Sequence, residues 1–397
     1  MAINTGTSTL AEHAKEAPLQ FLDLGKQFEQ IRAEVKRAVT QVLETQRFVL
    51  GPEVEQLEAE ISNYLGCRFA VACASGTDAL ILALLAAGIR HGDEVITTPF
   101  TFVATASAIT RAGAVPVFVD VDPNTYNLDP EKTREAISPK TRAIIPVHLF
   151  GLAAEMQPIM DLARQHGIAV IEDAAQAIGG AYHEKNLGTI GSLGCFSFFP
   201  SKNLGGAGDG GIVTTNDATY ADRLRLLRVH GSRHKYEYEI LGMNSRLDAI
   251  QAAILRVKLR YLEQWTEQRR RNAGRYRRFI AQSLSSNSPV VMPMEPNGTR
   301  HVYNQFTIRC KERDRLREHL LQNGIPTEIY YPHPLHLQPA FSYLGYREGS
   351  LPCAESAARE VVSLPIYPEL TEDQQRRIAG ALADFYDHVS ARNEREA

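Results

Sequence analysis

The short run IAVIEDA, at residues 168–174, begins with four apolar residues and ends in carboxylates, as a buried strand with a polar end does. Helix-length segments separate most of the similar runs elsewhere in the chain. The alternation predicts an α/β protein with a mainly parallel sheet covered by helices on both faces. The six further runs are FAVACAS (69–75), EVITTP (94–99), VPVFVDV (115–121), RAIIPVHLF (142–150), CFSFF (195–199) and GIVTT (211–215).

Helical patterns flank these runs. Over residues 27–44 apolar side chains recur every three or four positions with charges between them, which is one face of an amphipathic helix. A second amphipathic segment covers residues 54–65. After Asn244 a longer helical pattern continues without a breaker as far as Gly274, and we interpret it as the bridge into a second domain.

The C-terminal part shows a strand pattern, a helix pattern and an aromatic, Pro-rich loop, at HVYNQFTIRC (301–310), residues 314–323 and TEIYYPHPLHLQPAF (327–341). This order predicts a small α+β domain. We therefore expect a flexible tail, a large domain that includes the N-terminal helices, and a small C-terminal domain, with the bounds 1–20, 21–265 and 266–397.

Composition limits the classes of function. The 397 residues carry 43 Lys and Arg against 46 Asp and Glu, a formal charge of -3, which argues against a dedicated nucleic-acid binder. No window approaches the roughly 18 unbroken apolar residues of a membrane span, and the first residues lack the apolar stretch of a secretory signal. Five widely spaced cysteines fit neither a disulfide framework nor a zinc site, so we expect a cytoplasmic protein.

Polar residues follow the predicted strands. In parallel sheets ligands bind beyond the carboxyl ends of the strands, so we expect the functional site at that edge. The segments that reach it are SGTD (75–78), TPFTF (98–102), HLFG (148–151), EDAAQA (172–177) and FPSKN (199–203).

Lys202 follows the apolar run 195–200 and precedes five glycines within residues 205–211. Most lysines are solvated surface charges. A lysine held at a strand end beside glycines is partly desolvated, which lowers the pKa of its amine and lets it form a Schiff base with a carbonyl. The pattern alone identifies no cofactor.

Asp173 should lie at the mouth of a buried strand, because four apolar residues precede Glu172. One interpretation is a structural carboxylate or a helix N-cap. The other is a buried anion opposite a protonated ring nitrogen, since each opposite charge favours the ionised form of its partner. Gln176, three residues on, could place an amide near a ring hydroxyl.

The segment 75–78 lies between a strand and a helix pattern, where unpaired amides and a positive dipole end can bind phosphate. Gly76 would allow the anion to approach closely, although an ordinary N-cap explains the pattern equally well. Ser197 could add a hydroxyl. Phe102 is either a core residue or a face for stacking a flat cofactor.

Two other chemistries are disfavoured. His333 and His336 flank Pro334, so they cannot share a helical face as zinc ligands do, and we expect no metal site. The glycines of GGAGDGG neither follow the dinucleotide fingerprint nor open a helix, which argues against a nicotinamide site.

Together these motifs resemble the PLP-dependent aminotransferases of fold type I, and in particular the DegT/StrS family, which aminates nucleotide-linked keto sugars. The resemblance covers nearly the whole chain after the tail. It implies a three-layer fold with a central seven-stranded, mainly parallel mixed sheet and a smaller C-terminal α+β domain. The motifs that carry it are FLDLGKQ, GPEVEQLE, SGTDAL, GDEVITTPFTFVATA, VDPNTYNLDP, PVHLFG, EDAAQAIGG, FSFFPSKNLGGAGDGG, HGSRHKY, NSRLDAIQAA, YYPHPLHLQPAF and SLPIYPELT.

The resemblance implies roles around pyridoxal 5'-phosphate (PLP). Lys202 matches the lysine that binds the cofactor covalently, and Asp173 matches the carboxylate that faces the pyridine nitrogen. Gln176 matches the contact to the ring hydroxyl. Phe102 stands where relatives often have Tyr or Trp, so stacking on the ring is kept while a hydroxyl or indole contact is lost.

The phosphate and the substrate involve further positions. Gly76, Thr77 and Ser197 match phosphate ligands. Asn244 matches a residue that reaches the phosphate from the partner subunit, which implies a homodimer with shared active sites. In the family the positions of Arg246 and Tyr331 lie near the substrate and the sugar nucleotide, respectively.

The resemblance implies transfer of an amino group from L-glutamate to a nucleotide-diphosphate-linked keto sugar, for glycan or secondary-metabolite biosynthesis. The motifs favour a 3-keto sugar linked to UDP or dTDP. Related dehydratases carry histidine at the cofactor lysine, so Lys202 favours amination. Two alternatives stay open, a keto-cyclitol aminotransferase and a non-catalytic PLP-binding regulatory protein.

Overall fold

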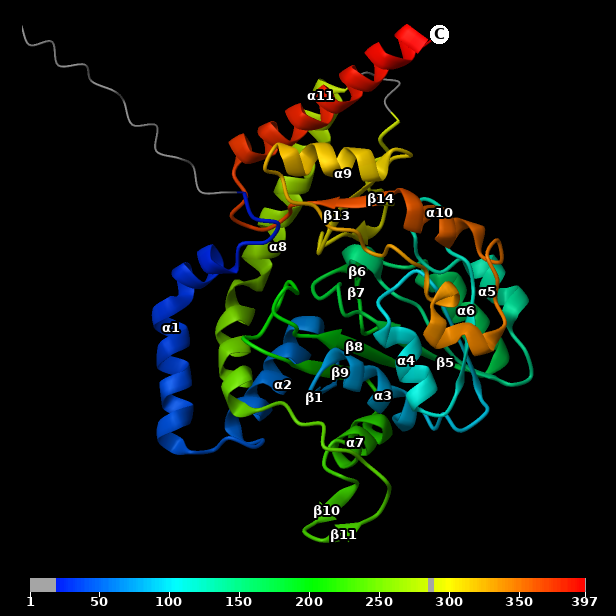
Figure 1. Ribbon diagram of the computed structural model, residues 1–397. Coiled ribbons are helices and arrows are strands. Elements are labelled where there is room, and N and C mark those ends of the chain that lie inside the picture. The colour runs from blue at the N-terminus through cyan, green and yellow to red at the C-terminus, as the bar shows by residue number, and fades with distance from the viewer. Residues whose placement is uncertain (1–18, 285–288, 397) are drawn as a thin grey trace, which may run out of the picture.

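The computed structural model describes residues 19–284 and 289–396 (Figure 1). The tail predicted at 1–20 lies almost wholly outside these residues. Within them, none of the helices combines the length and the apolar character needed to cross a membrane.

A seven-stranded sheet forms the centre, in the order β1-β9-β8-β5-β4-β2-β3. β9 runs antiparallel to both its neighbours, and the other pairs are parallel. Every apolar run of the sequence supplies one strand, so the predicted mainly parallel mixed sheet is confirmed. The strands are β1 (Phe69–Cys73), β2 (Glu94–Thr97), β3 (Val115–Phe118), β4 (Thr141–Ile145), β5 (Ala169–Asp173), β8 (Leu193–Ser197) and β9 (Gly211–Thr215).

Helices cover both faces of the sheet and give three layers. In β1, Ala70 and Ala72 belong to one core cluster while Val71 and Cys73 belong to another, because successive strand residues point to opposite faces. The first cluster includes α2 (Pro52–Leu65), α6 (Met156–His166) and α8 (Ala249–Ser283), and the second includes α3 (Gly76–Ala86), α4 (Ala104–Arg111) and α7 (Ala218–Leu227).

The long helix α8 connects the parts of the chain. Asp248 caps it by accepting a hydrogen bond from the Gln251 amide at 2.8 Å, and the helix passes through Gly274 before it ends. The N-terminal helix α1 (Leu24–Thr45) packs along it, with Ile31 in a cluster that contains Trp265 (Figure 1).

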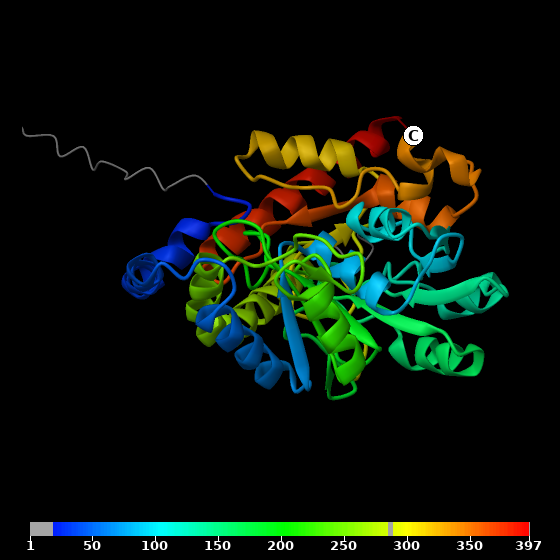
Figure 2. The same cartoon turned by 90° about the horizontal axis from the view of Figure 1, so that it is seen from below.

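The C-terminal elements form a separate core around Tyr276 and Phe306. They lie together along one side of the molecule (Figure 2). They are β13 (Phe306–Arg309), which pairs with β14 (Val361–Leu364), and the helices α9 (Arg313–Gln322) and α11 (Glu372–Glu396). The helix α10 (Pro352–Glu360) packs instead in a cluster with Phe100 and Phe118. The boundary predicted at residue 265 falls inside α8 and stays a prediction.

The strand expected over 301–310 is shorter, because only Phe306–Arg309 pairs with β14. The residues before it bind other parts of the protein instead, as described below. The remaining short elements are β6 (Ala181–Tyr182), β7 (Lys185–Asn186), β10 (Ser232–His234), β11 (Glu237–Tyr238), β12 (Thr299–Arg300), α5 (Pro130–Ala136) and the 3-10 turns Leu149–Gly151, Leu335–Leu337 and Pro339–Leu344.

Candidate active site

A pocket of about 600 Å³ lies at the carboxyl ends of the strands, where the sequence places the site. Eight of the ten predicted site residues line it, and Asn244 and Arg246 do not. The eight are Gly76, Thr77, Phe102, Asp173, Gln176, Ser197, Lys202 and Tyr331.

Lys202 lies in the turn between β8 and β9. Its backbone amide donates to the Phe199 carbonyl at 2.9 Å, and no hydrogen bond or ion pair holds its amine among the described residues. Burial lowers the pKa of the Lys202 amine to about 8, although nearby Asp173 opposes that shift. A larger fraction of this amine is therefore neutral and nucleophilic than of an ordinary lysine.

Helix α8 holds the glycine loop that follows Lys202. The Lys258 amine donates to the Gly205 carbonyl at 2.6 Å, and the Gln251 side chain accepts from the Ala207 amide at 2.8 Å. Burial lowers the pKa of Lys258 to about 8 as well, but this lysine does not line the pocket.

Asp173 ends β5 as a buried carboxylate. The Thr105 hydroxyl donates to Oδ2 at 2.8 Å and the Ala175 amide donates to Oδ1 at 3.2 Å. Burial raises the pKa of Asp173, while these donors and the Lys202 amine oppose the rise. A cation bound in the pocket would further favour the ionised carboxylate, so the site fits a protonated pyridine ring.

Two threonines that the sequence analysis missed support Asp173. Thr101 and Thr105 are buried, and their hydroxyl oxygens lie 3.0 Å apart. Because Thr105 donates to Asp173, it can accept from Thr101, which gives a chain of hydroxyls that ends at the carboxylate. The two threonines are four residues apart where α4 begins, and this spacing could have indicated that their side chains meet.

Gln176 connects two parts of the site. Its Oε1 accepts from the Phe150 amide at 2.6 Å, and its Nε2 donates to the Tyr331 hydroxyl at 3.1 Å. The side-chain amide is therefore fixed next to Tyr331. Burial and the charge of Asp173 both raise the pKa of the Tyr331 hydroxyl, which keeps it protonated and able to donate.

The start of α3 forms a cradle with β8. Ser75 caps the helix by accepting from the Asp78 amide at 3.1 Å, so the N-cap interpretation is confirmed. A Cβ on Gly76 would lie 2.6 Å from the Ser197 Cβ, so only glycine fits this close approach. The helix amides and the hydroxyls of Thr77 and Ser197 meet here, a donor set that suits a phosphate.

Phe102 is 56% exposed, so the interpretation as a core residue is wrong. Its ring lies at the pocket, 6.3 Å from the ring of Tyr331 at an angle of 38°. The two rings provide flat apolar surface beside Asp173 and Lys202, as a planar cofactor requires.

Asn244 and Arg246 lie outside the pocket of their own chain. Between them, the buried Ser245 hydroxyl accepts from the Ala74 amide at 3.2 Å, which fixes this segment next to the strand end that leads into α3. Asn244 is exposed there and could reach a second copy of the chain.

Gln305 and Asp209, which no sequence pattern indicated as site residues, also line the pocket. The Gln305 Oε1 atom is buried and has no hydrogen-bond partner within the described part of the chain. His336 instead has a structural role, because its Nε2 lies 3.0 Å from a carboxylate oxygen of Glu355. No cluster of three or more His, Cys, Asp or Glu suited to a metal occurs in 19–284 and 289–396.

Comparison with known proteins gives a consistent picture. The model of the DegT/DnrJ/EryC1/StrS aminotransferase family matches residues 29–383. A "pleiotropic regulatory protein" of Geobacillus stearothermophilus is 52% identical over 93% of this chain and 99% of its own length. A UDP-N-acetyl-3-dehydro-alpha-D-glucosamine 3-aminotransferase of Acidithiobacillus ferrooxidans is 46% identical over 91% of this chain and 96% of its own.

Among solved structures, S. venezuelae DesV in complex with a ketimine intermediate is similar throughout. It superposes with a TM-score of 0.90 and 44% identity, and the match covers 93% of this chain and 98% of DesV.

Proposed function

Because the chain belongs to the DegT/DnrJ/EryC1/StrS aminotransferase family, we propose that it is a PLP-dependent enzyme that moves an amino group from L-glutamate to a nucleotide-linked keto sugar. The observation that carries the proposal is the pairing of two groups in one pocket. Lys202 offers an amine with a lowered pKa, and Asp173 offers a buried anion.

When bound, PLP supplies a carbonyl for the amine and an electron-withdrawing ring. Lys202 would hold the cofactor covalently and, once the amino donor displaces it, would carry a proton between the donor carbon and the cofactor. Asp173 would keep the ring nitrogen protonated, since it is anchored by Thr105 and by the Ala175 amide.

The other pocket residues would bind and orient the cofactor. Thr77 and Ser197 would bind the phosphate at the start of α3, and Phe102 would cover one face of the ring. Gln176 would face the ring hydroxyl and at the same time would hold Tyr331 against the substrate.

We also propose that two copies share their active sites. Asn244 and Arg246 would enter the partner's pocket, where Asn244 would contact the phosphate and Arg246 the substrate. The exposure of Asn244 and the anchoring of the segment through Ser245 support this arrangement. Arg246 can pair with a diphosphate or with a sugar carboxylate.

For the acceptor we favour a 3-keto sugar linked to UDP or dTDP, because the relative from Acidithiobacillus is named as a 3-aminotransferase of a UDP-sugar. A keto-cyclitol would use the same cofactor residues with a different pocket rim. A nucleoside diphosphate should raise the melting temperature if the acceptor is a nucleotide sugar, since a ligand that binds only the native state stabilises it. An unchanged melting temperature would favour the keto-cyclitol as acceptor.

The regulatory alternative rests on the relative from Geobacillus, which is named as a regulatory protein. A non-catalytic PLP-binding protein needs the cofactor pocket but not a lysine able to carry protons. Lys202 keeps an amine with a lowered pKa that nothing else in the described chain binds, which favours catalysis.

The test is amino transfer itself. The holoenzyme is incubated with nitrogen-15-labelled glutamate and candidate UDP- and dTDP-keto sugars, and the sugar product is analysed by mass spectrometry. We expect the label in the sugar with the wild type and with a Lys185→Ala control, which changes an exposed lysine. Lys202→Ala should give none. Labelled product from Lys202→Ala would refute the proposal.

A further inference from the structure

Asn203, the residue after Lys202, is buried and does not line the pocket. Its Nδ2 donates to the Val302 carbonyl at 3.1 Å, and its Oδ1 accepts from the Asn304 Nδ2 at 3.0 Å. Both partners lie about a hundred positions further along the chain. The backbone next to Lys202 is thus held by residues 302–304, of which Tyr303 belongs to the C-terminal core.

That segment, residues 302–304, is itself fixed to the 3-10 turn Leu149–Gly151, which follows β4. The Val302 amide donates to the Gly151 carbonyl at 3.1 Å, and the Asn304 amide donates to the Phe150 carbonyl at 2.9 Å. The Phe150 amide donates in turn to Gln176 at 2.6 Å. A continuous series of hydrogen bonds therefore links the Lys202 turn to Gln176 on the other side of the pocket.

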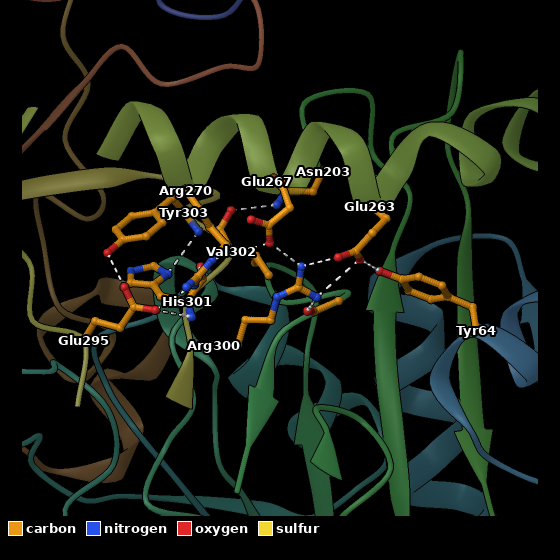
Figure 3. Close-up of polar contacts among 11 residues, drawn as sticks. Tyr64, Asn203, Glu263, Glu267, Arg270, Glu295, Arg300, His301, Val302 and Tyr303 are labelled. Carbon is orange, nitrogen blue, oxygen red and sulfur yellow. Dashed lines mark hydrogen bonds and ion pairs between the residues drawn. The ribbon is translucent and has the colours of Figure 1, made fainter. Parts of the chain in front are cut away.

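Helix α8 anchors the same segment from outside, as Figure 3 shows. Arg270 donates to the His301 carbonyl at 2.9 Å, and Arg269 donates to the Tyr303 carbonyl at 3.2 Å. Arg300 binds Glu263 and Glu267 of the helix. These outer contacts are made by helix α8, whereas the two bonds of Asn203 begin at the residue next to Lys202.

We propose that Asn203 is a positioning residue that holds Lys202 in place for proton transfer, through its two hydrogen bonds to residues 302–304. The proposal rests on the proposed function. No side-chain hydrogen bond orients the Lys202 amine among the described residues, so its place depends on the backbone of its turn. Proton transfer needs hydrogen-bond reach, and a small misplacement of the amine would slow it.

The test compares three variants of the full-length holoenzyme. Asn203→Ala removes both bonds, Asn304→Ala removes only one, and Arg300→Gln removes outer ion pairs as the matched control. We expect kcat to fall by roughly 10–100-fold in Asn203→Ala, with the KM values nearly unchanged. The kcat of Asn304→Ala should lie between those of the wild type and Asn203→Ala. This variant keeps the test informative if Asn203→Ala folds poorly. Arg300→Gln should keep its kcat even where it lowers the melting temperature.

A second readout does not depend on turnover. Apo-protein is mixed with PLP, and the visible absorbance reports how fast Lys202 binds it. We expect this rate to drop in Asn203→Ala and to stay at the wild-type value in Arg300→Gln. Equal rates in all variants, or an equal loss of kcat in Arg300→Gln, would overturn the positioning role alone. A wild type that never binds PLP would overturn the proposed function as well.

Discussion

Replacing Thr105 by valine tests the electrostatic support of Asp173. Valine keeps nearly the same shape but cannot donate to the carboxylate, whose Oδ2 lies 2.8 Å from the Thr105 hydroxyl. The Ala175 amide at 3.2 Å remains as the other donor. The substitution therefore removes one charge-assisted hydrogen bond from a buried anion that lines the pocket.

Such a bond contributes about 1.5–3 kcal/mol. Losing this donor disfavours the ionised carboxylate, so the pKa of Asp173, already raised by burial, should rise further. A group whose pKa is raised on folding stabilises the fold most below its unfolded pKa, and this contribution is lost as the pH rises through the folded pKa. The variant apo-protein should thus lose more stability at neutral than at acid pH.

The assay is urea unfolding of the apo-protein over a series of pH values, together with the Kd for PLP at neutral pH. We expect Thr105→Val to weaken PLP binding by roughly 10–100-fold, because a less ionised Asp173 attracts the ring nitrogen less strongly. Thr105→Ser should restore both properties, and Thr101→Val should have a smaller effect. A destabilisation independent of pH, or an unchanged Kd, would show that Thr105 does not support the charge of Asp173.

Three further outcomes are expected. Asp173→Asn should retain PLP but slow amino transfer by roughly 10²–10³-fold in single-turnover measurements, and a rate near wild type would contradict its role. Asn244→Ala should weaken PLP retention on gel filtration, whereas an unchanged cofactor content would argue against shared sites. Gly76→Ala should lower the free energy of unfolding by about 1–3 kcal/mol, because the added Cβ overpacks against Ser197, and should raise the Kd for PLP. Gly274→Ala, where an added Cβ would meet no other atom, should raise the free energy of unfolding in urea by about 0.5–1 kcal/mol.

The sheet could be predicted because each of its strands is a short apolar run with a polar end. The elements that escaped prediction, such as β6 (Ala181–Tyr182) and β12 (Thr299–Arg300), have two residues each and no periodicity to detect. The expected strand at 301–310 was too long because residues 302–304 bind Gly151, Phe150 and Asn203, contacts that local sequence does not reveal.

Candidate site residues could be predicted where the strand ends bring reactive side chains to one edge of the sheet, as at Lys202 and Asp173. Supporting residues could not, because their role depends on partners distant in sequence. Thr105 contacts a carboxylate 68 positions away, and Asn203 contacts residues about a hundred positions away. Phe102 remained ambiguous because apolar side chains can face a core or a pocket, and only the fold distinguishes the two.

The central claim is that Lys202 is the residue that binds PLP. The direct measurement is borohydride reduction of the PLP-loaded protein, followed by proteolysis and mass spectrometry of the labelled peptide. Burial lowers the pKa of both Lys202 and Lys258 to about 8, so reactivity alone does not choose between them. We expect a pyridoxyl group on Lys202 only, because that lysine lines the pocket and Lys258 does not. A label on Lys258, or on no lysine, would contradict it.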